Sequence, residues 1–184
     1  TYPVDRTKYY ISDSNVQYVL VQKELSEKVE SIKNCIYIDL DSDFYNYNFE
    51  NPNVSVEATD LSYMIYTSGS TGMPKGVMLN QVGFANMTKA MTKVLDYLKE
   101  GNKHTIVSVT STPFDIFVYE IIVSLTHGLK VVMANNAEHR NPKLLDALIK
   151  KYNVDVMTVT PSLMKINYDN REPNSALALV KNMV

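Results

Sequence analysis

Short apolar segments alternate with longer segments of helical periodicity over most of this 184-residue chain, and this alternation most constrains the fold. Parallel strands need a long crossover connection, so a strand, a helix and a second strand in succession form the basic unit of a parallel sheet. The sequence therefore predicts an α/β fold with a largely parallel sheet flanked by helices. The expected strands are 18–21, 36–38, 61–66, 77–79, 105–109, 129–133 and 154–159.

Capping residues indicate where the helices start and stop. Asn80 is a favourable N-cap for a helix whose apolar residues share one face, and Gly101 is expected to end this helix. The segment 114–126 is apolar nearly all round, so we expect a helix inside the protein. Asn141 followed by Pro142 predicts another helix start. The remaining expectations are a polar helix over 24–32, a surface connection over 39–60, and no further element after Val180.

The charge balance and the cysteine content exclude several classes of protein. Eighteen Lys and Arg residues against twenty Asp and Glu residues give a net charge of −2, which provides no broad positive surface for nucleic acid. No apolar run in the sequence approaches the roughly 20 residues that span a bilayer, and no secretion signal is recognisable. The single cysteine, Cys35, can form no internal disulfide and is expected to be a small buried residue. We therefore expect a cytoplasmic protein without nucleic-acid or membrane partners.

Three of the six glycines lie within eight residues, at Gly69, Gly72 and Gly76. Glycine allows positive φ and close approach of the backbone, so successive N–H groups can converge on an anion. The hydroxyl residues between these glycines add donors and Lys75 adds a positive charge, which is what the phosphates of a nucleoside triphosphate require. The alternative is a plain turn between two strands. A Walker loop does not fit, because Lys75 is followed by Gly76 and a strand rather than by Ser or Thr and a helix.

The segment 61–76, Leu-Ser-Tyr-Met-Ile-Tyr followed by Thr-Ser-Gly-Ser-Thr-Gly-Met-Pro-Lys-Gly, resembles the phosphate-binding signature of adenylate-forming enzymes. It is most similar to that of the amino-acid adenylation domains of nonribosomal peptide synthetases. Two flanking segments agree in order and spacing: 2–6 resembles the end of the family's Tyr-Pro-x-x-Arg segment, and 114–120 resembles its Phe-Asp-x-Ser-x-x-Glu segment. The resemblance implies part of the large N-terminal subdomain of such an enzyme. We expect residues 1–184 to be a fragment of one adenylation domain, truncated at both ends, without a second domain.

Members of this family use ATP and Mg to convert a carboxylic acid into an acyl-adenylate, and then pass the acyl group to a phosphopantetheine thiol. For this chain the resemblance implies activation of an amino acid, with a peptidyl carrier domain and the remainder of an antibiotic-producing synthetase as partners. The step depends on preplaced donors and cations, because charge builds on the phosphoryl group and on the leaving pyrophosphate. The family's Mg-binding, ribose-binding and catalytic residues come from later segments. We therefore expect the fragment alone to be inactive, with no catalytic residue and no metal ligand of its own.

The resemblance also assigns site residues. Asp115 matches the position that pairs with the α-ammonium group of the amino acid, although the residues alone also allow a capping box with Thr112. Ile116, Tyr119 and Thr158 match walls of the amino-acid pocket, for which core packing is the alternative. The residues that the resemblance implies for the β- and γ-phosphates are Thr67, Ser68, Gly69, Ser70, Thr71, Gly72 and Lys75.

Two other functions stay open at this point. An acyl-CoA or aryl-acid ligase of the same superfamily needs no partner for an α-ammonium group, so Asp115 distinguishes it from an amino-acid-activating enzyme. A non-catalytic nucleotide-binding module, complete in itself, would bind ATP without turnover. Phe117 stands where the family usually has Ser, and this change at the rim of the pocket bears on the pocket assignments more than on the phosphate loop.

Overall fold

The structure is a computed structural model that describes residues 3–22, 25, 36–39, 50–69, 72–99, 101, 103–162, 164–165 and 175–184. The chain forms two compact units. The N-terminal unit comprises Thr1–Asp60 and Tyr66–Met78, and the C-terminal unit comprises Leu61–Ile65 and Leu79–Val184. The prediction that the whole chain is a fragment of one domain stays a prediction.

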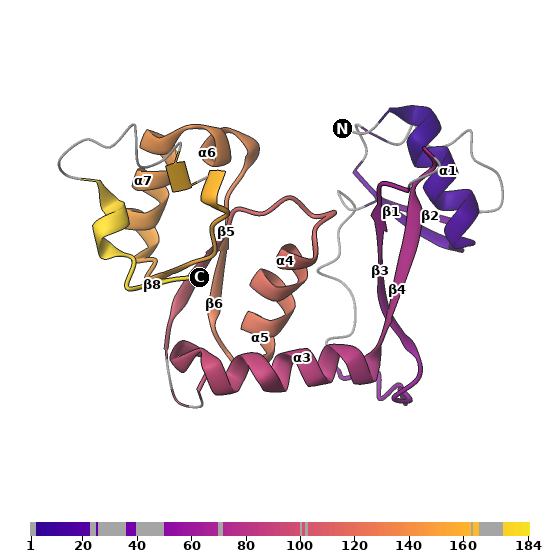
Figure 1. Ribbon diagram of the computed structural model, residues 1–184, viewed down its shortest axis with the longest axis horizontal. Helices are drawn as coiled ribbons and strands as arrows, with labels where there is room; N and C mark the ends of the chain where they lie inside the picture. The colour runs from indigo at the N-terminus through magenta and orange to yellow at the C-terminus, as the bar shows by residue number, and fades with distance from the viewer. Residues whose placement is uncertain are drawn as a thin grey trace. The chain divides into compact units, whose positions relative to one another are not determined.

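The N-terminal unit begins with helix α1 (Val4–Ser14), which was not among the expected elements (Figure 1). The helix ends at Asn15, whose φ of 52° is the left-handed conformation that commonly terminates helices. Strands β1 (Tyr18–Val21) and β2 (Ile36–Asp39) pair in parallel, as predicted for a strand–helix–strand unit. Two predictions for this unit lie outside the described residues: the helix over 24–32, of which residue 25 alone is described, and the burial of Cys35.

A hairpin follows, formed by strands β3 (Leu61–Thr67) and β4 (Lys75–Asn80). Both strands were predicted. The connection between them is too short for a parallel crossover, so the two strands are antiparallel. The preceding residues 50–60 contain turns and no helix or strand, in agreement with the expected surface connection.

The C-terminal unit contains a four-stranded parallel sheet with the strand order β6-β5-β7-β8. This sheet confirms the predicted fold class. The expectation that no element follows Val180 was wrong, because β8 pairs with β7 through two residues, too short a segment to show an apolar pattern. The four strands are β5 (Thr105–Ser108), β6 (Lys130–Met133), β7 (Val156–Met157) and β8 (Asn182–Met183).

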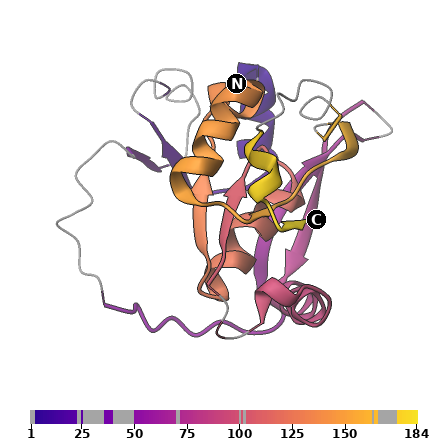
Figure 2. The same ribbon diagram turned by 90° about the vertical axis from the view of Figure 1, so that its left-hand side faces the viewer.

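One face of this sheet is covered by helix α7 (Pro142–Tyr152) and the 3-10 helix η4 (Ala176–Leu179), as Figure 2 shows. Helix α7 begins as predicted, because Asn141 accepts a hydrogen bond from Lys143 N at 3.0 Å. The buried cluster on this face consists of Val107, Val109, Val132, Leu145, Leu148, Ile149, Val154, Met157, Ala176 and Leu177.

The opposite face is covered by helix α3 (Gln81–Val94), the short helix η2 (Asp96–Leu98) and the helical segment that follows β5. Strand residues point alternately to the two faces, so the neighbours of Val107 and Met157 turn to this side. The sheet therefore forms the middle of three layers. The buried cluster on this face consists of Tyr97, Leu98, Ile106, Tyr119, Val123, Leu129 and Val156.

Helix α3 starts where expected and ends early. Asn80 caps it by accepting a hydrogen bond from Gly83 N at 2.9 Å. The expected end at Gly101 was wrong, because Leu95 takes an extended conformation with φ −105° and ψ 105°. This break turns the following residues, Tyr97 and Leu98, into the core, where both are buried.

The expected helix over 114–126 is present as one segment made of three parts: α4 (Asp115–Val118), the π-helical segment η3 (Tyr119–Val123) and α5 (Ser124–Thr126). Its expected burial on all sides was wrong. Ile122 and Leu125 are 44% and 55% exposed, because only one side of the segment packs on the sheet.

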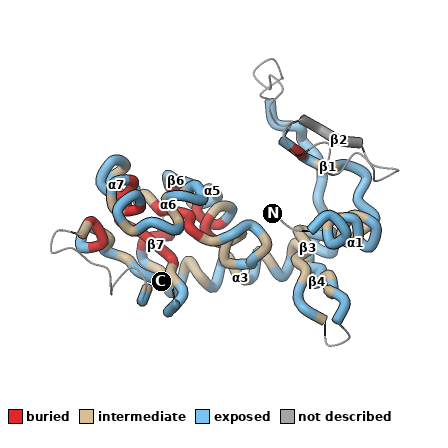
Figure 3. The backbone as a smooth tube through the Cα atoms, turned by 90° about the horizontal axis from the view of Figure 1, so that it is seen from above, coloured by how far each residue is buried: buried red, intermediate tan, exposed pale blue. Residues whose placement is uncertain are grey.

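A further short helix, α6 (Asn136–Arg140), was not among the expected elements. It is set by a capping box in which Asn135 and Glu138 satisfy each other's backbone amides. The buried residues gather on and between α7, β6, β7 and α5, as Figure 3 shows. Within the described ranges, no helix combines the length and the apolar character needed to cross a membrane.

Candidate functional site

The glycine-rich loop between β3 and β4 owes its shape to two glycines that act for different reasons. Gly72 N donates to Gly69 O at 3.1 Å and closes a tight turn. A Cβ atom on Gly69 would lie 2.0 Å from the carbonyl oxygen of Met73, so no side chain fits there. Gly72 has open space around it but a φ of 85°, which disfavours side-chain-bearing residues. Two of the predicted site residues, Ser70 and Thr71, lie outside the described residues.

The described loop residues present hydrogen-bond donors and no negatively charged side chain. Thr67 and Ser68 are exposed at the end of β3, and Lys75 is exposed at the start of β4. Among the described residues, no carboxylate lies within salt-bridge distance of Lys75. Hydroxyl groups, backbone N–H groups and one ammonium group around a tight glycine turn suit an anion with several oxygens.

Helix α1 supports both ends of this loop within the N-terminal unit. The Tyr9 hydroxyl donates to the carbonyl oxygen of Pro74 at 2.9 Å, next to Lys75. At the other end the Tyr66 hydroxyl donates to Asp13 Oδ2 at 2.7 Å. Burial raises the pKa of Tyr66 to about 12, helped by the hydrogen bond to Asp13, so this hydroxyl stays a donor at neutral pH. Sequence analysis missed these supports, which come from a helix far away along the chain.

The Tyr66 ring is also held by stacking. Its centroid lies 4.2 Å from that of Tyr10, with the ring planes 28° apart. Tyr9 meets Tyr66 nearly edge-on at 6.3 Å. Offset stacking and edge-to-face contacts are the favourable arrangements of aromatic pairs. The three rings therefore hold α1 against the residue that precedes the loop.

The predicted substrate residues belong to the C-terminal unit, at the carboxyl edge of its parallel sheet. Asp115 begins the helical segment after β5, and Thr158 directly follows β7. β5 and β7 are parallel neighbours, so their carboxyl ends share one edge, which is where open α/β sheets bind ligands. Val107 pairs with Met157, which places Thr158 level with Ser108.

Asp115 is exposed, and its carboxylate forms no capping box with Thr112. The N-cap residue is Phe114, which makes no side-chain capping bond, so the alternative capping box is absent. Asp115 Oδ1 accepts a hydrogen bond from the adjacent amide, Ile116 N, at 2.9 Å. In the part of the chain that is described, no Lys or Arg pairs with this carboxylate. It remains able to bind a cation.

Tyr63 of β3 lies near this carboxylate. Burial raises the pKa of Tyr63, and the negative charge of Asp115 adds to the effect. The Tyr63 ring also meets Phe84 of α3 edge-on at 6.2 Å. The first helical turn after β5 thus has an aromatic neighbour from the hairpin strand, which sequence analysis did not assign to the site.

The three predicted pocket-wall residues differ in their surroundings. Ile116 is half-buried beside Asp115. Tyr119 is 5% exposed, belongs to the core cluster and is hydrogen-bonded to the Tyr97 hydroxyl, which matches the core-packing alternative for this residue. Thr158 is 8% exposed, and its hydroxyl has no hydrogen-bond partner among the described residues. Of the three, Thr158 presents a buried polar group that a ligand could satisfy.

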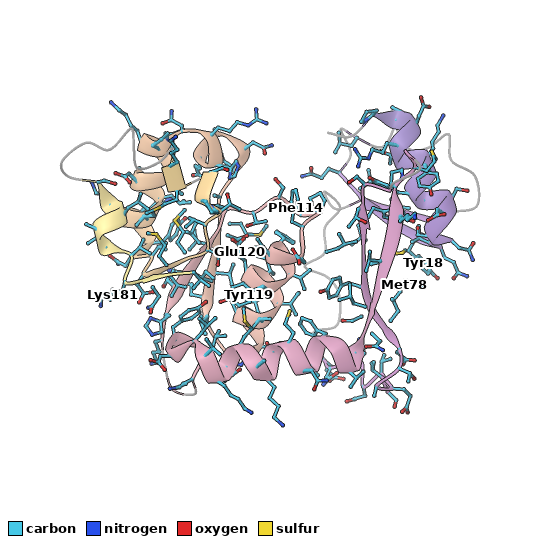
Figure 4. The ribbon with its side chains drawn as sticks, viewed as in Figure 1. Tyr18, Met78, Phe114, Tyr119, Glu120 and Lys181 are labelled. Carbon is cyan, nitrogen blue, oxygen red and sulfur yellow. The ribbon has the colours of Figure 1, made fainter. Side chains whose placement is uncertain are left out.

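Glu120 is a buried carboxylate to which sequence analysis assigned no chemistry (Figure 4). It is 0% exposed and accepts hydrogen bonds from Ser108 Oγ at 2.7 Å, Thr110 Oγ1 at 2.8 Å and Thr110 N at 3.1 Å. Burial raises its pKa, and the hydrogen bonds from Ser108 and Thr110 oppose this effect. An acidic residue within an apolar helix was the signal that could have identified it. Among the described residues, no three His, Cys, Asp or Glu side chains gather into a metal site.

Comparison with known proteins shows the family. The family described as AMP-binding enzyme matches residues 1–182. The chain belongs to the AMP-binding enzyme family. Tyrocidine synthase 3 of Brevibacillus parabrevis is 35% identical over 168 residues, which cover 89% of this chain and 2% of that protein. Bacitracin synthase 3 of Bacillus licheniformis is 29% identical over 175 residues, covering 90% of this chain and 3% of that protein. The chain thus spans a few per cent of the length of these relatives.

Solved structures agree with this AMP-binding fold. The nonribosomal peptide synthetase FmoA3, in a form bound to α-methyl-L-serine-AMP, has a TM-score of 0.81 at 21% identity. It covers 98% of this chain, which in turn covers 20% of that protein. O-succinylbenzoate coenzyme A synthetase from Bacillus subtilis, in complex with AMP, has a TM-score of 0.74 at 15% identity, covering 100% of this chain and 45% of that protein. At these identities the likeness establishes the fold, which is the predicted N-terminal subdomain of adenylate-forming enzymes.

Proposed function

We propose that the protein to which this chain belongs activates an amino acid with ATP as an aminoacyl-adenylate in nonribosomal peptide synthesis. The acyl group then passes to the phosphopantetheine thiol of a carrier domain of the same cytoplasmic synthetase. The observation that carries the amino-acid assignment is Asp115, an exposed carboxylate at the carboxyl edge of the sheet without a cation partner among the described residues. The family match and the synthase relatives support the adenylation chemistry.

The glycine-rich loop would hold the β- and γ-phosphates of ATP. The tight turn at Gly69 and Gly72 fits a phosphate cradle, because a side chain at Gly69 would meet the backbone and the neighbouring hydroxyls are exposed. Lys75 would neutralise part of the charge that builds on the departing pyrophosphate. Bound Mg would supply further neutralisation of the phosphates. Its protein ligands are proposed to come from segments of the synthetase other than the described residues.

The carboxyl edge of the C-terminal sheet would hold the amino acid. The Asp115 carboxylate would pair with the α-ammonium group, which orients the substrate carboxylate for attack on the α-phosphorus. Ile116 and Tyr119 would contribute to the wall of the pocket, and the Thr158 hydroxyl would meet the substrate side chain. Attack forms the bond between the carboxylate oxygen and the α-phosphorus, while the bond to the pyrophosphate breaks and pyrophosphate leaves.

The test is amino-acid-dependent ATP–pyrophosphate exchange by the intact synthetase module, with wild-type protein and Asp115→Ala. Loss of a hydrogen-bonded contact between two charged groups costs up to about 3 kcal/mol, so we expect exchange at low amino-acid concentration to fall by up to about 100-fold. Asp96→Ala is the matched control, since Asp96 is an exposed carboxylate of the same unit that pairs with Lys99 on the surface. It should leave exchange unchanged.

The same assay separates the rival functions. If wild type activates a simple carboxylic acid better than any amino acid, and Asp115→Ala does not change this preference, the chain belongs to an acyl- or aryl-acid ligase. If wild type binds ATP but no acid promotes exchange, the non-catalytic nucleotide-binding module is correct. Either result would overturn the amino-acid assignment.

A further inference from the structure

The residues around Asp115 form a loop whose base is closed by a single buried side chain. β5 ends at Ser108, and the chain then runs over the carboxyl edge to Asp115. Five residues later the same helical segment brings Glu120 back to the end of β5. There its carboxylate accepts one hydrogen bond from Ser108 and two from Thr110. The exposed Asp115 carboxylate lies at the tip of this closed loop, and the buried Glu120 carboxylate lies at its base.

Little else among the described residues fixes this tip. Phe114 N donates to Ser111 O at 3.1 Å, a bond local to the turn. Phe114 itself is 60% exposed, and Ser111 and Thr112 are also exposed. The tip residues 111–115 belong to neither apolar cluster of the unit, although Tyr63 of β3 lies near Asp115. The hydrogen bonds at the base therefore contribute to the position of the tip.

The π-helical segment gives Glu120 its inward orientation. Tyr119, Glu120 and Val123 are buried within this segment, whereas Asp115 and Ile116 precede it in ordinary helical conformation. π-helical turns are rare and occur frequently at functional sites. Here the turn directs a carboxylate into the apolar layer, where burial is costly unless its oxygens are bonded. Ser108 and Thr110 meet that requirement.

We propose that Glu120 is a positioning residue for recognition of the substrate's α-ammonium group, acting through the segment 108–115 that it closes. This inference rests on the proposed function. Glutamate suits the task because its two oxygens accept from three donors at once. A glutamine would offer one acceptor oxygen, and its NH2 group would lie against the donors of Ser108 and Thr110. The Asp115 carboxylate, which binds the positive charge of the substrate, would then vary in its position.

The experiment is a double-mutant cycle in the intact synthetase module, with Glu120→Gln, Asp115→Ala and the combined variant, measured by ATP–pyrophosphate exchange. Glu120→Gln should raise the KM for the amino acid about tenfold, because disturbing a buried charged hydrogen-bond network costs about 1.4 kcal/mol. The KM for ATP should stay unchanged. The combined variant should be no worse than Asp115→Ala alone, because Glu120 acts through Asp115.

Controls separate positioning from simple support of the fold. Thr110→Val removes one hydroxyl donor while keeping the shape, so it tests the network even if Glu120→Gln folds poorly; we expect an amino-acid KM about threefold higher. Glu138→Gln removes a half-buried carboxylate of the same unit, outside the Glu120 network, and should leave both KM values unchanged. Additive penalties in the cycle, or equal rises in both KM values, would show that Glu120 only stabilises the core. An Asp115→Ala variant with normal amino-acid dependence would instead refute the proposed function itself.

Discussion

The two units hold their site residues in place by different physical means. In the N-terminal unit, Val21 is the one buried residue among those described, and the glycine-rich loop is held by backbone geometry and tyrosine hydroxyls. In the C-terminal unit, two apolar clusters cover both faces of a parallel sheet. There the carboxylate at Asp115 follows a strand that is buried on both sides.

This difference determines which substitutions disturb each region. A loop shaped by backbone conformation is sensitive to added side chains, because the nearest neighbour of Gly69 is a main-chain oxygen and the positive φ of Gly72 disfavours a Cβ atom. A loop closed by a buried carboxylate is sensitive to the chemistry of that one group, because burial makes each hydrogen bond to its oxygens costly to lose. Substitutions in the glycine-rich loop should therefore raise the KM for ATP. Substitutions in the loop closed by Glu120 should raise the KM for the amino acid.

The largest expected effect is in the loop, at Gly69→Ala. The new Cβ would lie 2.0 Å from Met73 O, so the backbone must shift. A rearrangement that costs about 3 kcal/mol would lower pyrophosphate exchange about 100-fold, and we expect this loss to appear as a higher KM for ATP. Kinetics of the intact module with ATP varied at saturating amino acid measure this.

Gly72→Ala is the matched control for this prediction. The new Cβ atom meets no atom of the described residues within 4 Å, but residue 72 must adopt a φ near 85°, a strain of about 1 to 2 kcal/mol. Its exchange rate should fall about tenfold, less than for Gly69→Ala. A larger effect at Gly72 would mean that conformational freedom, and not close approach, shapes the loop.

Much of the loop was predictable from its sequence, because close glycine spacing has few physical explanations. The requirement for glycine at Gly69 and Gly72 is confirmed by the clash and by the positive φ. The support from Tyr9 and Tyr66 was not predictable, since it joins residues that are 65 and 53 positions from their partners. No local pattern encodes such contacts.

The sheet of the C-terminal unit was predictable for a similar reason. Apolar strands bounded by caps such as Asn80 and Asn141 produce clear periodic signals. The places where a helix ends early or changes its geometry were not predictable from the sequence. Leu95 ends its helix without a glycine or proline, and the π-helical segment turns Glu120 inward with no sequence mark other than one acidic residue among apolar ones.

A smaller effect is expected for Tyr9→Phe, which removes the hydrogen bond to Pro74 O and keeps the ring. Loss of one neutral hydrogen bond costs about 1 kcal/mol, so the KM for ATP should rise about fivefold while the KM for the amino acid stays constant. Tyr10→Phe is the control from the same helix, because its hydroxyl is bonded to Arg6 of α1 and its ring still stacks on Tyr66. Equal KM values for ATP in the two variants would show that α1 does not support the loop through Tyr9.

The smallest effect is a pH dependence of stability in the C-terminal unit. Burial raises the pKa of Glu120 above its ordinary value of 4.5, so the folded state binds this proton more tightly than the unfolded state. The resulting contribution to stability is fully present below pH 4.5 and is lost as pH rises through the folded-state pKa. Glu120→Gln cannot ionise, so wild type should lose stability relative to this variant as pH rises from 4.5 toward 7.

Thermal unfolding of the intact module at several pH values measures this difference. Asp96→Asn is the control, because the hydrogen bond and charge of Lys99 lower the pKa of Asp96 below 3.8 and leave no titration in this range. The difference between wild type and Asp96→Asn should therefore be flat. A rising difference for Glu120→Gln would mean that the bonds from Ser108 and Thr110 outweigh burial. The base of the Asp115 loop would then be held by a carboxylate that is more easily ionised in the folded state than in water.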